Sequence, residues 1–383
     1  MIYADNAATT RLSDAAYNAM LPYLRDEYGN PSSAHRMGQA ARNAVEEARA
    51  IIAECIGAQP DEIIFTSGGT ESDNMAITSL FLQAPNAKWG WKHCITTPFE
   101  HHAVLRPISG NSFRYGVEPS YLDPHENGIV NYLEMQDDIR RDTGFVSVMY
   151  ANNEVGTIQP IMKIGVTLDT FNIPLHVDAV QAVGHIPINV KREHIDYLSA
   201  SAHKFHGPKG VGFLYARRPC VVRPLLLGGS QECYARAGTE NAPGIVGMAA
   251  ALKESVDHMQ EDTERITKLR DKLIDGLLET PGSWLNGDPV QRLPGNVNVG
   301  FEGVEGNALV LALSWYDICI SAGSACTTGT LEPSHVLTAM GQPPEQANCA
   351  VRMTLSRYNT AEEIDTIIHA TRREVARLRE FGG

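Results

Sequence analysis

The fold is decided by the stretch Glu62–Asn74, which reads EIIFTSGGTESDN. Its apolar start predicts a strand over 62–66, the glycines predict a turn, and a helix is expected from Thr70. The same alternation recurs along the first two-thirds of the chain. Further strands are expected at 93–97, 145–150, 174–177, 197–200 and 211–215, and a helix at 37–56 that ends at Gly57. Strands separated by helices predict βαβ units, and therefore an α/β protein with a mostly parallel sheet covered on both faces.

The pattern changes after about residue 244. A long helix is expected over 245–279, followed by short strands at 296–300 and 349–355 mixed with helices. The last helix is expected to begin at Thr360, because Glu363 follows three residues later as in a capping box. We therefore expect a second, smaller α+β domain in this part of the chain.

Composition argues against several classes of protein. The chain has 383 residues, 43% of them hydrophobic, and a net charge of −13, which disfavours a nucleic-acid partner because binding phosphates needs an excess of Lys and Arg. No apolar run approaches the roughly 20 residues of a membrane span, and the first residues lack the features of a signal peptide. The seven cysteines are dispersed and form no CxxC pair, a pattern typical of reduced thiols. We expect a cytoplasmic protein with no membrane partner.

The turn between the first predicted strand and its helix is a candidate phosphate site. Gly68 and Gly69 let the backbone approach a ligand closely, the helix start offers free N–H groups, and Thr70 adds a hydroxyl. The segment is neither a Walker motif nor GxGxxG. Many glycine-rich turns between a strand and a helix bind nothing, so this turn alone leaves both interpretations open.

Lys204 and Asp178 each follow a predicted strand. A lysine at a strand end, beside a histidine, suits a Schiff-base former, since burial or positive neighbours can release its proton. A surface lysine near a loop is the other interpretation. A buried carboxylate at Asp178 needs a cationic partner such as a pyridinium nitrogen, although strand-end aspartates also cap helices. The two residues together are what pyridoxal phosphate requires of a protein.

His101 and Arg352 are two further candidates. An imidazole after the strand at 93–97 could stack on a flat ring and move protons near neutral pH. A metal site at His101 and His102 is disfavoured, because neighbours on a helix point about 100° apart. Arg352, within a strand-like run, can either face water or hold a substrate carboxylate with two hydrogen bonds.

Cys326 lies in the segment 321–330, which reads SAGSACTTGT. Small residues and glycines predict a flexible, exposed loop, in which a thiolate could travel between a buried cofactor and an outside acceptor. Cys319, between Ile318 and Ile320, fits a structural role better.

Taken in order, these segments resemble the cysteine desulfurases of the NifS and IscS type, which are pyridoxal-phosphate enzymes of fold type I. The likeness runs over nearly the whole chain, from Tyr3 to the final helix. Its ordered motifs are YADNAATT at 3–10, GNPSS at 29–33, Ser67–Asn74, Glu100–His101, NNEVG at 152–156, DAVQ at 178–181, Ser201–Lys204 and Ser324–Cys326.

The resemblance implies a role for each candidate. Lys204 would carry the cofactor as a Schiff base and act as a base, with His101 as a proton carrier. Cys326 would be the nucleophile that forms a persulfide, and it could also ligate a transient iron–sulfur cluster. Arg352 and Asn153 would bind the substrate L-cysteine. The cofactor-binding residues would be Gly69, Thr70, His101, Asn153, Asp178, Gln181, Ser201, His203 and Lys204, together with Thr239 from the second subunit.

It also implies the architecture and the partners. The fold would be that of a type I pyridoxal-phosphate transferase, with a seven-stranded, mostly parallel sheet in a large domain over 15–257. The small domain would combine 1–14 with 258–383 and carry the mobile catalytic-cysteine loop at about 321–332. We expect a homodimer that passes sulfur to a scaffold protein of the NifU or IscU type for iron–sulfur cluster assembly.

Some details favour the nitrogen-fixation NifS branch, and so a supply for nitrogenase: the segments 238–241 and 329–336, and a tail that ends at Gly383. Two residues depart from the family pattern. Ala322 stands where serine is usual, and His102 replaces a commoner lysine or proline. Alternatives are a selenocysteine lyase or another fold type I enzyme such as an aminotransferase, and a non-enzymatic sulfur or metal carrier.

Overall fold

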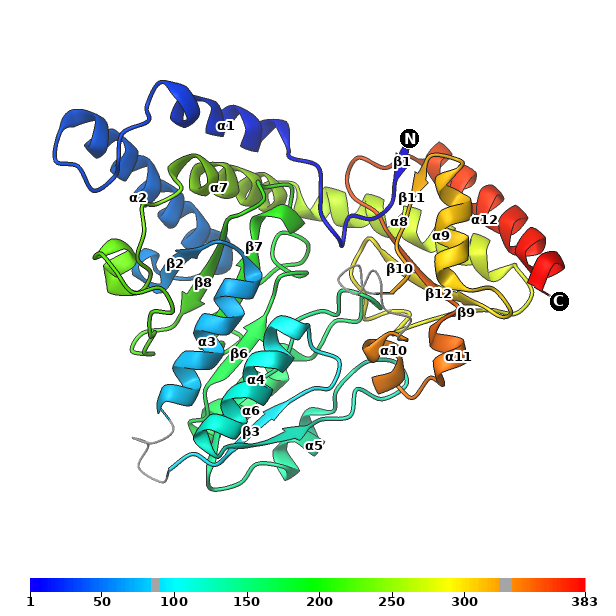
Figure 1. Ribbon diagram of the computed structural model, residues 1–383, viewed down its shortest axis with the longest axis horizontal. Coiled ribbons are helices and arrows are strands. Elements are labelled where there is room, and N and C mark those ends of the chain that lie inside the picture. Colours follow the sequence, from blue (N-terminus) through cyan, green and yellow to red (C-terminus); the bar gives the residue numbers. More distant parts are fainter. Residues whose placement is uncertain (84–89, 324–332, 383) are drawn as a thin grey trace.

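The computed structural model describes residues 1–83, 90–323 and 333–382. In Figure 1, the large sheet and its helices form the left-hand part of the molecule, and a smaller sheet lies to the right, near both chain termini. Within the described residues, no helix is long and apolar enough to cross a membrane.

The large sheet has seven strands in the order β2-β8-β7-β6-β5-β3-β4. The pairs that β6 makes with β5 and β7, and that β3 makes with β4 and β5, are parallel, whereas β8 is antiparallel to both β2 and β7. The predicted mostly parallel sheet is therefore confirmed. The strands are β2 Ile63–Thr66, β3 His93–Thr96, β4 Glu118–Tyr121, β5 Thr143–Ser147, β6 Leu175–Asp178, β7 Tyr197–Ser201 and β8 Gly212–Ala216.

Helices cover both faces of this sheet. Successive side chains on each strand point to opposite faces, so neighbouring residues enter different cores. Leu198 packs with α2, α6 and α7 in one apolar core, whereas its neighbour Tyr197 packs with α3 and α4 in another. The helices are α1 Asp14–Arg25, α2 Arg36–Ile56, α3 Gly69–Gln83, α4 His102–Tyr115, α5 Tyr132–Asp137, α6 Ile161–Phe171 and α7 Ala242–Asp257.

The smaller sheet is antiparallel, in the order β12-β10-β9, and it packs on the helices α8, α9 and α12. The N-terminal strand β1 pairs with β11, so the start of the chain joins its C-terminal part. This supports the predicted division into 15–257 and 1–14 plus 258–383, which stays a prediction. The elements are β1 Ile2–Tyr3, α8 Met259–Leu278, β9 Ser283–Leu285, β10 Asn296–Phe301, α9 Gly306–Ser314, β11 Ile318–Cys319, α10 His335–Ala339, α11 Pro344–Ala347, β12 Ala350–Thr354 and α12 Ala361–Gly382.

Local signals set several boundaries as expected. Gly57 ends α2 with a φ of 73°, a conformation that glycine adopts without strain. The capping box before α12 is present, since the N–H of Glu363 donates to Thr360 Oγ1 and the N–H of Thr360 donates to the Glu363 carboxylate. The single helix expected over 245–279 is wrong: it is two helices, α7 and α8, because His258 takes a non-helical backbone conformation between them.

Candidate active site

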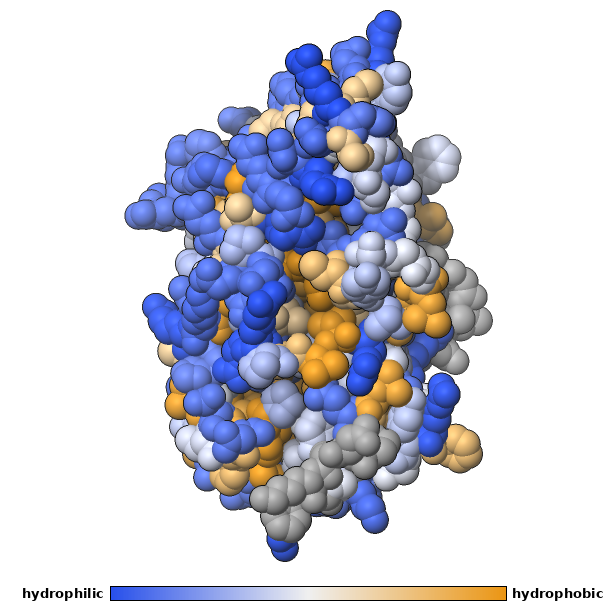
Figure 2. All heavy atoms as spheres, turned by 90° about the vertical axis from the view of Figure 1, so that its left-hand side faces the viewer, coloured by the Kyte–Doolittle hydropathy of each residue, from blue (hydrophilic) through white to orange (hydrophobic). Residues whose placement is uncertain are grey.

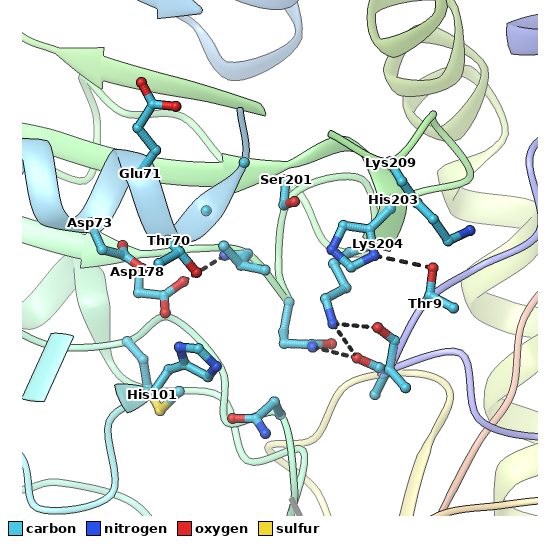
Figure 3. Close-up of a pocket in the computed structure, with 18 of the residues that line it drawn as sticks. Thr9, Thr70, Glu71, Asp73, His101, Asp178, Ser201, His203, Lys204 and Lys209 are labelled. Atoms are coloured by element: carbon cyan, nitrogen blue, oxygen red, sulfur yellow. Dashed lines mark hydrogen bonds between the residues drawn. The ribbon is translucent and has the colours of Figure 1, made fainter. Parts of the chain in front are cut away.

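A cavity of about 480 Å³ opens at the carboxyl ends of β6 and β7, where parallel sheets usually bind ligands (Figure 3). Its walls come from the N-terminal segment, the turn before α3, the start of α4, the residues after β6 and β7, and β12. The predicted site residues that line it are Gly69, Thr70, His101, Asn153, Asp178, Gln181, Ser201, His203, Lys204 and Arg352. Thr239 is exposed and does not line this cavity, and Cys326 lies outside the described residues.

Lys204 lies in the short turn that follows β7 and points into the cavity (Figure 3). Its ammonium donates to the carbonyl oxygens of Ala7 at 2.5 Å and Ala8 at 2.9 Å. A segment near the N-terminus therefore contacts a lysine that lies 197 residues after Ala7 in the chain. Neither alanine is among the predicted site residues, although both belong to the YADNAATT motif at 3–10.

Asp178 is the last residue of β6 and is only 6% exposed. Its Oδ1 accepts a hydrogen bond of 3.0 Å from the N–H of Val180. Burial, and then the neighbouring carboxyl of Asp73, raise the pKa of Asp178 to about 7. A buried carboxylate is stabilised by a cation placed against it, so a protonated pyridine nitrogen fits this position.

His101 caps the start of α4, and its ring lies in the cavity (Figure 3). Burial and the charge of Lys204 lower its pKa to about 4, so the imidazole is neutral near pH 7. Its Nδ1 accepts from the N–H of Ala103 at 3.1 Å, which places the ring proton on Nε2. The adjacent His102 instead stacks on His335, with ring centroids 4.6 Å apart. No cluster of metal-binding side chains is found in the described parts of the chain.

The turn before α3 forms a cradle suited to a phosphate. Gly68 has a φ of 152°, and a Cβ on Gly69 would lie 2.5 Å from Val180 Cγ2, so both positions require glycine. Hydroxyls from Thr70 and Ser201 face this part of the cavity. The donors fit the dianionic phosphate of the cofactor, because a helix start attracts anions.

Two further side chains complete the cradle. The Nδ1 of His203 lies 3.2 Å from Thr9 Oγ1, and burial lowers its pKa to about 4. Lys209 also lines the cavity and supplies a positive charge. Lys209 is not among the predicted site residues, although it stands in the same run as Lys204 after β7.

Gln181 and Asn153 line the cavity through different elements. Gln181 follows β6, and its Nε2 donates to the carbonyl of Ala7 at 3.0 Å. Asn153 belongs to the loop after β5, and its carbonyl accepts from Arg352. Gln181 is thus connected to Ala7, which also accepts from Lys204, and Asn153 is connected to Arg352.

Arg352 stands in the middle of β12 and is only 2% exposed, so the interpretation that it faces water is wrong. Its guanidinium donates to the carbonyl of Asn153 at 3.0 Å and to the Asp5 carboxylate at 2.9 Å. These contacts fix the guanidinium plane at the cavity, as binding a carboxylate with two hydrogen bonds requires.

Comparisons with known proteins agree with this site. The model of the Aminotransferase class-V family matches residues 2–367. A cysteine desulfurase IscS of Methanosarcina thermophila is 47% identical, over 99% of this chain and 93% of the relative, and a cysteine desulfurase of Nostoc sp. is 46% identical, over 99% and 94%.

Solved structures give the same result. A NifS-like protein superposes with a TM-score of 0.91 at 39% identity, over 98% of this chain and 99% of the other. SspA in complex with cysteine superposes with a TM-score of 0.82 at 34% identity, over 94% and 100%. The chain therefore belongs to the Aminotransferase class-V family and, within it, to the cysteine desulfurases, which are pyridoxal 5′-phosphate enzymes.

Proposed function

We propose that this enzyme converts L-cysteine to L-alanine and takes the sulfur onto Cys326 as a persulfide. The observation that carries the proposal is the convergence of Lys204, Asp178 and His101 on one cavity that also holds a phosphate cradle and Arg352. When bound, pyridoxal phosphate supplies an electron sink for the substrate's Cα.

The residues of the cavity divide the remaining work. Asp178 holds a proton at the ring nitrogen, and Arg352 binds the substrate carboxylate. Nζ of Lys204 removes the Cα proton, and the neutral His101, with its proton on Nε2, moves protons near the ring.

The proposed sulfur step uses the Cys326 thiolate. Its Sγ attacks the sulfur of the substrate, and an S–S bond forms as the C–S bond breaks. The electron pair of the broken bond stays with the substrate carbon, which takes up a proton and leaves as alanine. Overall, cysteine plus a thiol give alanine plus a persulfide, so the atoms balance and no outside oxidant is needed.

A single assay tests this function. Purified enzyme with L-cysteine and no reductant is expected to form about one alanine and one persulfide per subunit, and a thiol reductant should then allow repeated turnover with equal alanine and sulfide. Pyruvate and ammonia in place of alanine would indicate elimination. Turnover of L-selenocysteine with none of L-cysteine would favour the selenocysteine lyase instead.

Arg352→Gln is expected to raise the KM for L-cysteine by about 100-fold, because a charged hydrogen bond to a buried carboxylate is worth about 1.5–3 kcal/mol. The kcat should change far less. Steady-state kinetics on L-cysteine check the split, with Arg357→Gln as the control, since Arg357 is an arginine beyond β12 that does not line the cavity. An unchanged KM would remove Arg352 from substrate binding.

We also propose a homodimer, a scaffold protein as sulfur acceptor, and a cytoplasmic location. Apolar side chains are exposed at Leu225, Leu226, Leu227 and Tyr234. Figure 2, which views the molecule from the left-hand side of Figure 1, shows apolar residues in the middle of that face. Thr239 lies close to this segment in the chain. In a dimer formed through this surface, Thr239 of one subunit would reach the cofactor phosphate bound by the other. All described cysteines are free thiols, which suits a reducing compartment. A supply dedicated to nitrogenase stays a prediction.

A further inference from the structure

A buried polar cluster, which we call the Asp73 cluster, lies next to Asp178. It consists of Asp73 on α3, Ser147 at the end of β5, His176 on β6 and Ser199 on β7. Each of the four is at most 1% exposed. The roles proposed above use none of them, although Asp73 lines the cavity and belongs to the Ser67–Asn74 motif.

Strand register brings the cluster together. His176 and Asp178 are two residues apart on β6 and therefore share one face of the sheet. Ser147 lies beside His176 on β5, and Ser199 lies beside Asp178 on β7. Helix α3 packs on this face and presents Asp73 about one turn after Thr70. The helix that begins at the phosphate cradle thus also delivers a carboxyl to the neighbourhood of Asp178.

The hydrogen bonds of the cluster form a directed chain. Ser147 Oγ lies 2.8 Å from His176 Nδ1, and His176 Nε2 lies 3.2 Å from Ser199 Oγ. The same Nε2 lies 3.5 Å from Asp73 Oδ1, a contact that is not a hydrogen bond. When Asp73 is ionised, the following proton positions satisfy these contacts. Ser147 donates to Nδ1, Nε2–H donates to Ser199, and the Ser199 hydroxyl donates to the Asp73 carboxyl. Every donor in this chain is directed toward Asp73, as an ionised carboxylate requires.

We infer that Asp73 is a positioning residue for the cofactor. The negative charge of the Asp73 carboxylate favours a proton on the ring nitrogen, which Asp178 contacts. His176 and Ser199 fix the carboxylate in place. The inference rests on the proposed function, in which Asp178 meets that nitrogen. It assigns a second carboxylate, in addition to that of Asp178, to stabilising the protonated ring that acts as the electron sink.

Within the described residues, the cluster holds no counterion that would neutralise Asp73. Asp73 Oδ1 has no hydrogen-bond partner among the described residues, so its charge is poorly neutralised. Burial raises the pKa of Asp73 to about 7 and lowers that of His176 to about 4, so His176 is a neutral donor and not a counterion. Glu100, from the segment after β3, adds a third buried carboxyl whose pKa is also raised by burial.

Besides His176, the described residues place two further cationic or potentially cationic groups near these carboxyls. They are Lys204, from the turn after β7, and His101, at the start of α4, which is neutral near pH 7. Three buried acids this close together do not all ionise without a cation near them. A pyridinium ring supplies that cation, and each carboxylate that remains charged then strengthens its hold on the proton.

The test compares two probes on the cofactor-free, full-length chain. One is pyridoxal 5′-phosphate, and the other is its analogue with CH in place of the ring nitrogen. The dissociation constant of the analogue divided by that of pyridoxal 5′-phosphate isolates the contribution of the nitrogen. Asp73→Asn keeps the size of the side chain and removes its charge, and it is expected to lower the ratio by about tenfold, the effect of one pKa unit. Ser199→Ala should lower it by a smaller factor.

The matched control is Ser120→Ala. It removes a comparable contact, 2.8 Å between Ser120 Oγ and His93 Nε2, from another histidine of the same sheet that does not line the cavity. This variant should leave the ratio unchanged. As a second readout, the ¹⁵N chemical shift of the ring nitrogen should move toward the unprotonated value in Asp73→Asn and in Ser199→Ala. If Asp73→Asn folds poorly, Ser199→Ala still tests the inference.

The outcomes separate the two levels of the proposal. If the wild-type chain binds both probes equally well, Asp178 does not hold the ring nitrogen and the proposed site is wrong. If the wild type prefers the nitrogen-containing ring while Asp73→Asn and Ser199→Ala keep both its ratio and its ¹⁵N shift, the proposed site stands and the role of Asp73 is overturned.

Discussion

Lys204→Ala is expected to lower the turnover of L-cysteine by about 10⁴-fold, the upper range for loss of a positioned acid–base group. The folded chain should still bind pyridoxal phosphate, because the cradle residues Gly69, Thr70 and Ser201 are untouched. The physical reason is that Nζ of Lys204 is the amine that the carbonyls of Ala7 and Ala8 hold in the cavity. Single-turnover measurement of alanine at saturating cofactor checks the size of the effect.

Two controls distinguish lost chemistry from lost binding. Lys209→Ala removes another cation of the same cavity, and it is expected to weaken cofactor binding while keeping turnover at saturation. A small amine added to the Lys204 variant should restore part of the rate, since it can take the place of the missing base. Near-normal turnover by Lys204→Ala without added amine would rule out its proposed role.

The second large effect is expected for Cys326→Ala, which should form no protein persulfide and no alanine above background. Three of the described thiols cannot take over, because only a thiolate is nucleophilic. Burial raises the pKa of Cys55 and of Cys220 to about 11, and that of Cys94 to about 12, so these thiols stay protonated at pH 7. Persulfide labelling followed by peptide mapping, together with an alanine assay, measures the loss.

Cys349→Ala is the matched control for that variant. Cys349 is a free, partly exposed thiol whose Sγ contacts the carbonyl of Glu345 at 3.2 Å, and it does not line the cavity. Its removal should leave alanine formation unchanged. Full activity in Cys326→Ala, or persulfide found on another cysteine, would transfer the nucleophile's role elsewhere.

Secondary structure and candidate residues could be predicted from the sequence where all the signals lie within one segment. The strand, turn and helix of Glu62–Asn74 appear as β2, the cradle and α3, since apolar residues, glycines and a helix start are signals within one stretch. The edge strand β4 was missed, because Glu118–Tyr121 is partly exposed and contains a proline, so it lacks the apolar pattern of a buried strand. The predicted strand at 145–150 begins two residues earlier, at Thr143, and ends at Ser147.

What the sequence alone determined is therefore the order of the motifs and the type of chemistry that each residue offers: an amine, an acid, an imidazole and a thiol. Only the tertiary structure decided which of the described groups meet. It carried Ala7 and Ala8 to Lys204, buried Arg352 against Asp5, and set Asp73 near Asp178. Such contacts depend on strand register and on which helix face packs against the sheet, and both are fixed by burial of the whole core and not by any one segment.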